Sequence, residues 1–287
     1  MNVLPSNELG YSDLSALWPS GEILLVSYTP GNLDLTIRIP TTFLAGSGCG
    51  THGFVEHIAQ ILVEEPGSLR RKTDPETELE EDTEPDTAVY VFIPAEKGTS
   101  FTETRGPEGK RSRYRKVDDF DSDRYSSVSH SSQCYEPHEQ HFRELVTARD
   151  GWCHFTQSAG DDCVAAHLVP QSRGDVYDQL GFRHPYRADC GLLLNPSLHG
   201  GYDRYRWSLY HKDGVYRFIS LEGKKPEFAQ HHGKTVTAPF LPSHEPPHSS
   251  FWRGQDPPHP ALCDWHFRQA VMKNIRGYSV RMAINAQ

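Results

Sequence analysis

The stretch from Phe142 to Asp203 decides the fold of this chain. It opens with FRELVTARDGWCHFTQSAGDDCVAAHLVP and closes, after a polar connection, with RADCGLLLNPSLHGGYD. Residues 153–157 and 163–169 read as two short strands joined by residues 158–162, since short apolar runs alternate there with turn-forming residues. His167 falls near the end of the second strand, so we expect its imidazole at the edge of a β-ribbon.

A helix is predicted directly after the apolar GLLL. Asn195 and Pro196 mark its start, because asparagine caps exposed backbone amides and proline fits the first helical position. His199 then lies on the helix and Asp203 one turn later, so the two side chains share a face and can aim at one ion. In a chain with 16 histidines, the alternative is that His167 is a hydrogen-bonded core residue and Asp203 an ordinary surface acid.

This arrangement suits hydrolysis. A divalent metal held by His199 and Asp203 would polarise a phosphoryl oxygen and stabilise the leaving alkoxide, while neutral His167 takes the proton from attacking water. Histidine fits this task because its ordinary pKa, about 6.5, lets it accept a proton near neutral pH. Oxygen and imidazole ligands without a thiolate cluster favour Mg²⁺ or Mn²⁺ as the ion.

Four segments in this half of the chain resemble the HNH endonuclease domain proteins common in fungi, which have a ββα-metal core. They read FRELVTARDGWCHFT, AAHLVP, GLLLNPSLHGGYD and LCDWHFRQAVMKNIRG, and the resemblance spans about Phe142 to Gly277. It implies that His167 activates water and that His199 binds the metal. It also implies an Asn nine residues before His199 that holds the loop between the two histidines.

The sequence departs from the family pattern at two positions. Cys190 stands where the family has the central Asn, and Ala166 stands where many such nucleases have an acidic metal ligand. Asp203 or Asp189 can supply the missing carboxylate. Cys190 is either an inert buried thiol, a sign of a weakened site, or a reactive group, since a neighbouring His activates a thiolate as a nucleophile.

The N-terminal part predicts a small α+β unit over residues 1–95. Its elements are expected as two strands within residues 22–39, a helix over 52–65 and a buried strand over 87–94. Residues 74–86 carry eight acidic side chains and no basic one, which indicates a mobile, solvated loop. The motif GCGTHG at 48–53 formally fits a dinucleotide loop, but no βαβ alternation follows, so we interpret it as a flexible turn into the helix.

A charged linker is predicted over residues 96–136, followed by an HNH-like domain over 137–287. Residues 260–276 carry apolar side chains at helical spacing and predict a closing C-terminal helix. The fold class expected for the whole chain is therefore α+β. The pair His138 and His141 resembles half of a zinc-protease signature, but the second His of that signature falls one position later, so an exposed polar helix start is favoured.

The amino-acid composition limits which binding partners and cellular locations are expected. The 29 basic and 38 acidic residues disfavour non-specific nucleic-acid binding, because that affinity comes chiefly from Lys and Arg. No apolar run is long enough for a membrane helix and no signal peptide is evident, so no membrane partner is expected. The six cysteines form no C-x-x-C pair, which favours free thiols and an intracellular location, in the nucleus or the cytoplasm.

Three functions stay open at this point. The first is a metal-dependent endonuclease or phosphodiesterase acting on DNA, with a local positive path contributed by basic residues near the motif: Arg173, Arg183, His184, Arg187, Arg204 and Arg206. The second keeps the fold for small-molecule chemistry, as in a cyclase, isomerase or lyase with an apolar pocket at His167. The third is a non-catalytic scaffold.

Overall fold

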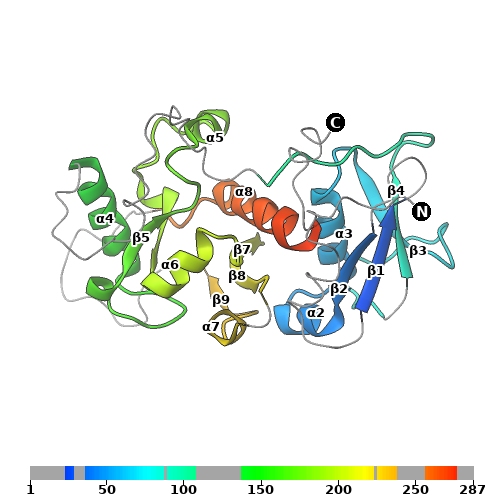
Figure 1. Ribbon diagram of the computed structural model, residues 1–287, viewed down its shortest axis with the longest axis horizontal. Helices are drawn as coiled ribbons and strands as arrows, with labels where there is room; N and C mark the ends of the chain where they lie inside the picture. The colour runs from blue at the N-terminus through cyan, green and yellow to red at the C-terminus, as the bar shows by residue number, and fades with distance from the viewer. Residues whose placement is uncertain are drawn as a thin grey trace, which may run out of the picture. The chain divides into compact units, whose positions relative to one another are not determined.

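The computed structural model describes residues 23–28, 36–86, 89–107, 137–222, 225–237 and 256–276. They form two compact units of mixed helix and strand, which confirms the α+β class (Figure 1). Unit 1 comprises Met1–Pro107, Ser197–Ala238 and Cys263–Gln287, and unit 2 comprises Glu108–Pro196 and Pro239–Leu262. Within these described ranges, none of the helices has the length and apolar character needed to cross a membrane.

A four-stranded sheet forms the N-terminal part of unit 1. Its strands are β1 (Ile23–Tyr28), β2 (Thr36–Pro40), β3 (Gly67–Arg71) and β4 (Val89–Pro94), in the order β2-β1-β4-β3. β1 and β2 pair antiparallel, with Val26 opposite Ile37, whereas β1 and β4 run parallel. The antiparallel pair predicted within residues 22–39 is confirmed, and its turn at 29–32 lies outside the described residues.

Two short helices follow β2, namely α2 (Thr41–Ser47) and α3 (His52–Ile61). The helix predicted over residues 52–65 is confirmed but ends earlier. Its end is explained by Gln60, whose side-chain amide donates to the backbone carbonyls of Val63 at 3.3 Å and Glu65 at 3.0 Å. These bonds satisfy carbonyls in a turn that leads into β3, so the chain need not continue as helix.

The glycines between α2 and α3 have a structural reason. Gly48 ends α2 in the left-handed conformation, with φ +66°, and a Cβ at Gly50 would lie 2.2 Å from the carbonyl oxygen of Leu44. A tight turn between two packed helices therefore requires both glycines. This agrees with the interpretation of GCGTHG as a turn rather than a dinucleotide loop.

The acidic segment 74–86 has no helix or strand, and most of its residues are exposed. It is nevertheless bonded to the start of α3. The backbone N–H groups of His52 and Gly53 donate to the carbonyls of Thr83 and Glu81, each at 2.9 Å. The segment thus accepts the hydrogen bonds that the first turn of a helix leaves unmade.

A second sheet and two helices complete unit 1. They are β7 (Trp207–Lys212), β8 (Val215–Ser220), β9 (Thr235–Thr237), α7 (Pro226–Ala229) and α8 (Pro260–Val271), the last continued by the π-helical turn η5 (Met272–Arg276). Phe267 of α8 lies 5.2 Å from Tyr210 of β7 and 6.2 Å from Phe54 of α3, between ring centroids. The helix predicted over residues 260–276 is therefore confirmed, and it packs into the hydrophobic core of unit 1.

The two units differ from the consecutive domains expected at 1–95 and 137–287. Residues 197–238 and 263–287 group with the N-terminal segment instead. The reason is burial, because the apolar side chains of β7, β8 and α8 share one core with those of β1–β4 and α3. The linker expected over 96–136 is described only up to residue 107, and the rest lies outside the described residues.

Unit 2 contains residues 142–196, most of the stretch from Phe142 to Asp203. Its elements are α4 (Pro137–Asp150), the 3₁₀ turns η2 (Gly160–Asp162) and η3 (Ala188–Cys190), β5 (Val164–His167), α5 (Gly174–Gln179) and β6 (Gly191–Leu194). β5 and β6 pair antiparallel, with His167 opposite Gly191. The helix predicted at Asn195-Pro196 is confirmed as α6 (Pro196–Tyr202), which begins at the last residue of this part of unit 2 and continues into unit 1.

One predicted strand is wrong. Residues 153–157 form a turn, in which Cys153 donates its N–H to the carbonyl of Ser158 at 2.9 Å and accepts from the N–H of Gln157 at 2.8 Å. Gln157 has φ +61°, which no strand residue adopts. The partner of β5 is β6, whose four residues are all buried. β6 is an apolar run buried on both faces, so its pairing with β5 buries more apolar surface than a pairing with residues 153–157 would.

Candidate functional site

His167 ends β5 at the surface of unit 2 and is half-buried. Its ring stacks on Phe142 of α4, with centroids 4.0 Å apart and planes at 16°, and meets the edge of Tyr186 at 5.9 Å. The side-chain nitrogen of Gln171 lies 3.4 Å from His167 Nε2. The amide N–H donates in this contact when Nε2 is unprotonated, so the neighbours are compatible with an imidazole that accepts a proton.

The space around His167 is small, and both polar and apolar side chains line it. A pocket of about 170 Å³ is lined by His167 and Phe142 together with the charged side chains of Glu139 and Arg143. It is no closed apolar cavity. The expectation of an apolar small-molecule pocket at His167 therefore gains no support from unit 2.

Cys190 is fully buried in η3. Burial, with the nearby carboxylate of Asp189 as second cause, raises the pKa of the Cys190 thiol to about 12. Thiolate is the nucleophilic form of cysteine, and it is scarce at neutral pH for such a group. These properties fit the inert buried thiol and disfavour the reactive alternative. Asp189 is itself bonded to the guanidinium of Arg187 at 2.7 and 2.9 Å, which occupies this other candidate carboxylate.

A buried ion pair holds the backbone on both sides of Cys190. Arg149, at the end of α4, donates to the carbonyl of Ala188 at 2.7 Å and to that of Gly191 at 2.8 Å. Asp150 receives two short bonds from Arg149, at 2.6 and 2.9 Å, and accepts the backbone N–H of Leu193 at 2.9 Å. The turn is thus anchored although a thiol replaces the amide that the family has there.

Sequence reasoning missed this pair. Its one local signal is the adjacent Arg149-Asp150 before Gly151, which resembles any charged helix end. Only burial distinguishes it, since the side chains are 3% and 0% exposed. Charges buried to this degree are retained only when paired and fully hydrogen-bonded.

His199 and Asp203 lie on and just after α6 in unit 1. His199 Nε2 and Asp203 Oδ1 are 3.6 Å apart, and the two side chains are 30% and 35% exposed. The prediction that they share a face is therefore confirmed. Their imidazole nitrogen and carboxylate oxygen suit a hard divalent ion that takes its other ligands from water and substrate, as Mg²⁺ commonly does.

No larger ligand set is present, because the described residues contain no group of three or more His, Cys, Asp or Glu that could hold a metal ion. The candidate residues are divided between the units. His167 and Cys190 belong to unit 2, and His199 and Asp203 to unit 1.

Fewer arginines are available for the expected positive path than the sequence indicates, because several of them form ion pairs. Arg173, Arg187 and Arg206 each form an ion pair, with Asp175, Asp189 and Glu222 respectively. Arg183 and Arg204 are exposed. Neutralised guanidinium groups release few counterions on binding, so they contribute less to phosphate affinity than unpaired ones.

Comparison with known proteins assigns this segment. β5, β6 and α6, with α5 and η3 between the two strands, follow the ββα order of HNH-type metal nucleases, with His167 on the ribbon and His199 on the helix. Residues 153–210 match the family described as HNH endonuclease, which indicates nuclease-type activity and a nucleic-acid substrate. The match is shorter than the resemblance from Phe142 to Gly277. No curated protein and no solved structure matches the chain.

Proposed function

We propose that this chain is a metal-dependent endonuclease or related phosphodiesterase of HNH type, with DNA as substrate and Mg²⁺ or Mn²⁺ as the ion. One observation carries the proposal. The match to the HNH endonuclease family over residues 153–210 includes His167, His199 and Asp203. These are the three residues whose side chains can supply a base and two metal ligands for hydrolysis.

His167 is the proposed general base. Its imidazole takes the proton from a water molecule as the oxygen of that water attacks the phosphorus atom. Stacking on Phe142 and the contact with Gln171 restrict the ring, and a base that keeps its orientation loses little entropy on reaction.

His199 and Asp203 are the proposed metal ligands. Their facing donor atoms supply one imidazole nitrogen and one carboxylate oxygen. When bound, a divalent ion at these residues would neutralise charge on the phosphoryl group and stabilise the leaving alkoxide. Cys190 takes no part in the proposed chemistry, because its thiol is buried.

The test is cleavage of supercoiled plasmid by the full chain with Mg²⁺ or Mn²⁺, and with EDTA as the metal-free condition. We expect nicking that EDTA abolishes. His199→Ala and Asp203→Asn should need more metal or lose cleavage. Asp213→Asn is the matched control, because Asp213 is a surface turn carboxylate with φ +53°, which asparagine tolerates.

Two results would overturn the proposal. One is an intact plasmid, and intact RNA, at every concentration of either ion. The other is a His199→Ala variant that cleaves as fast as the parent at limiting metal, since this would identify a contaminating nuclease or a different site.

A further inference from the structure

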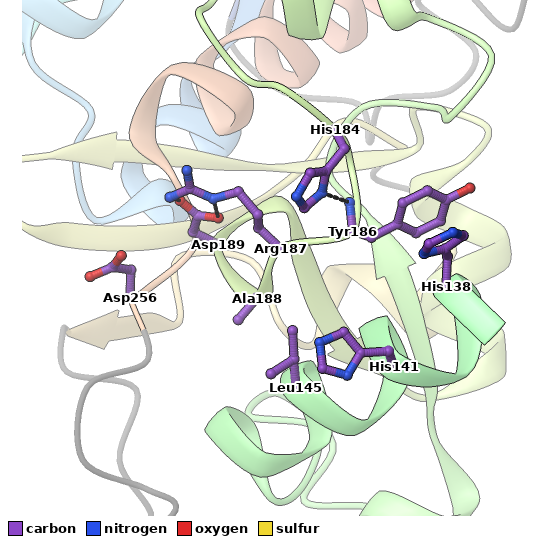
Figure 2. A pocket seen from close by; sticks show the side chains of 9 residues that line it. All are labelled: His138, His141, Leu145, His184, Tyr186, Arg187, Ala188, Asp189 and Asp256. Atoms are coloured by element: carbon purple, nitrogen blue, oxygen red, sulfur yellow. Dashed lines mark hydrogen bonds and ion pairs between the residues drawn. The ribbon is translucent and has the colours of Figure 1, made fainter.

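A second pocket lies next to His167 within unit 2. It has a volume of about 530 Å³, three times that around His167, and histidines of α4 and of the connection between α5 and η3 line it (Figure 2). Tyr186 lines this pocket, and its ring also meets the ring of His167 edge-on, with centroids 5.9 Å apart. Whatever fills the pocket therefore lies one aromatic ring away from the proposed general base.

The wall at Tyr186 is aromatic and accessible. His138 and His184 both stack on the Tyr186 ring, with centroids at 5.5 and 6.4 Å and planes within 27° of parallel. Both imidazoles are exposed, and Figure 2 shows these rings gathered on one side of the pocket. Near-parallel flat rings at a surface offer stacking area to another flat ring.

The charges of the pocket do not suit a phosphate. Arg187 is its one guanidinium, and Asp189 neutralises it through two hydrogen bonds of 2.7 and 2.9 Å. Asp256, on the far side from Tyr186 in Figure 2, adds a negative charge. Apart from its three histidines, the pocket offers an anion only the carboxylate of Asp256 and the mutually neutralised pair of Arg187 and Asp189, whereas a neutral planar ring would meet no repulsion from Asp256.

We propose that this pocket holds an unpaired nucleobase of the substrate strand, stacked against the aromatic wall that Tyr186 forms with His138 and His184, beside the phosphodiester on which His167 acts. The proposal rests on the proposed nuclease function and adds which form of DNA the enzyme prefers as substrate. A base inside a duplex cannot reach such a pocket, so the enzyme prefers single-stranded or locally unpaired DNA. Stacking tolerates every base, so it selects strand form and not sequence.

Binding without cleavage tests this directly. The full chain, in EDTA, is titrated with fluorescently labelled oligo-dT of about 12 nucleotides, with an abasic strand of the same length, and with a blunt duplex. Tyr186→Ala should weaken oligo-dT binding by roughly 5- to 150-fold, the loss typical of one stacking aromatic ring, and change the other two by less than about 2-fold. Tyr186→Phe keeps the ring and should bind as the parent does.

Controls separate stacking from charge and from misfolding. Leu180→Ala removes an exposed apolar side chain from the same connection and should leave all three affinities unchanged. The Tyr186→Ala loss should also be equal at low and high salt, because a lost phosphate contact would reduce the salt slope by about 1. His138→Ala supplies a second variant, with a smaller loss on oligo-dT alone, should Tyr186→Ala fail to fold.

Three outcomes would overturn the inference: oligo-dT binding that survives loss of the ring, equal weakening on the abasic strand, or duplex binding as tight as single-strand binding. These failures differ from failure of the nuclease. A chain that cleaves plasmid but shows no base dependence lacks the base pocket, whereas one that shows base dependence but never cleaves lacks the proposed activity.

Discussion

Histidines have opposite environments in the two units. In unit 1, His52, His57, His211, His231, His232 and His266 all have a lowered pKa with burial as the largest cause. His266 is the extreme case, held between the hydroxyl of Ser208 at 2.8 Å and the carbonyl of Tyr202 at 3.1 Å. In unit 2, by contrast, His138, His141, His167 and His184 line pockets.

The contrast teaches that a histidine count does not locate a site. Most histidines of unit 1 are packing residues in ring contact with Tyr and Phe side chains, whereas four histidines of unit 2 line pockets. Each unit has an exception. His154 of unit 2 is packed with a lowered pKa, and His199 of unit 1 faces Asp203 at the surface.

The largest expected effect concerns His167, the proposed general base of unit 2. His167→Ala should lower metal-dependent cleavage by roughly 10²- to 10⁴-fold, the usual contribution of a general base, with little change in the urea midpoint. His266→Ala should do the reverse, because it removes two buried hydrogen bonds and leaves activity per folded molecule intact. Initial rates of plasmid nicking and urea unfolding distinguish them, and equal cleavage by His167→Ala and the parent would refute the assigned base.

The next prediction concerns the buried ion pair of unit 2, formed by Arg149 and Asp150. Arg149→Met leaves Asp150 buried without its partner and should cost roughly 3 to 5 kcal/mol of stability. Hydrogen exchange in β5 and β6 measures it, since these strands border the anchored turn. Arg204→Met, at an exposed arginine, is the control. Equal protection of β5 and β6 in both variants would show that the anchor is dispensable.

The third prediction concerns pH and unit 1. Burial lowers the pKa of His266 to about 3, whereas in the unfolded chain it titrates near its ordinary value of about 6.5. The unfolded state therefore binds the proton first, and stability present above about pH 6.5 is lost as the pH falls toward about 3. Between about pH 7 and pH 5 the loss from this residue should be about 2 kcal/mol.

His266→Gln removes the titrating group and supplies the comparison. Urea unfolding at the two pH values should show a loss smaller by about 2 kcal/mol in this variant than in the parent. The remaining loss comes from the other packed histidines of unit 1, whose pKa shifts have the same sign. Identical losses in variant and parent would mean that His266 is not the packed neutral ring described above.

The smallest effect is expected where an ion pair is exposed. Arg70 and Glu78 join β3 to the acidic segment at 2.8 Å, but Glu78 is 84% exposed. Glu78→Gln should change the free energy of unfolding by less than about 1 kcal/mol, because water screens such pairs. A loss comparable to that of Arg149→Met would show that the acidic segment contributes far more to stability than its exposure indicates.

Local features of the fold were predictable from the sequence. The antiparallel pairing of β1 with β2, the start of α6 at Asn195-Pro196 and the apolar face of α8 each follow from spacing and end signals within a few residues. The candidate site was predictable as residue types, because spacing and the family resemblance indicate His167, His199 and Asp203. Their confirmed part is the shared face of His199 and Asp203, and the joint role of the three stays a prediction.

Pairings across the chain were not predictable in the same way. Residues 153–157 resemble the partner of β5 because they are close in sequence, but β5 pairs with β6, whose four residues are all buried. The sequence indicates a positive path that includes Arg173, Arg187 and Arg206, but in the structure each of these arginines forms an ion pair with a carboxylate. The grouping of α8 with α3 likewise depends on which apolar faces meet.

Order along the chain thus determined the helices and strands that local periodicity and capping specify, together with the inventory of hydrolytic side chains. Folding in three dimensions decided which strand β5 pairs with, which charges are neutralised, which cysteine is inert and which histidines remain open to a ligand. The physical reason is that periodicity and caps act over one or two turns of backbone, whereas desolvation depends on every group that reaches the same place from anywhere in the sequence.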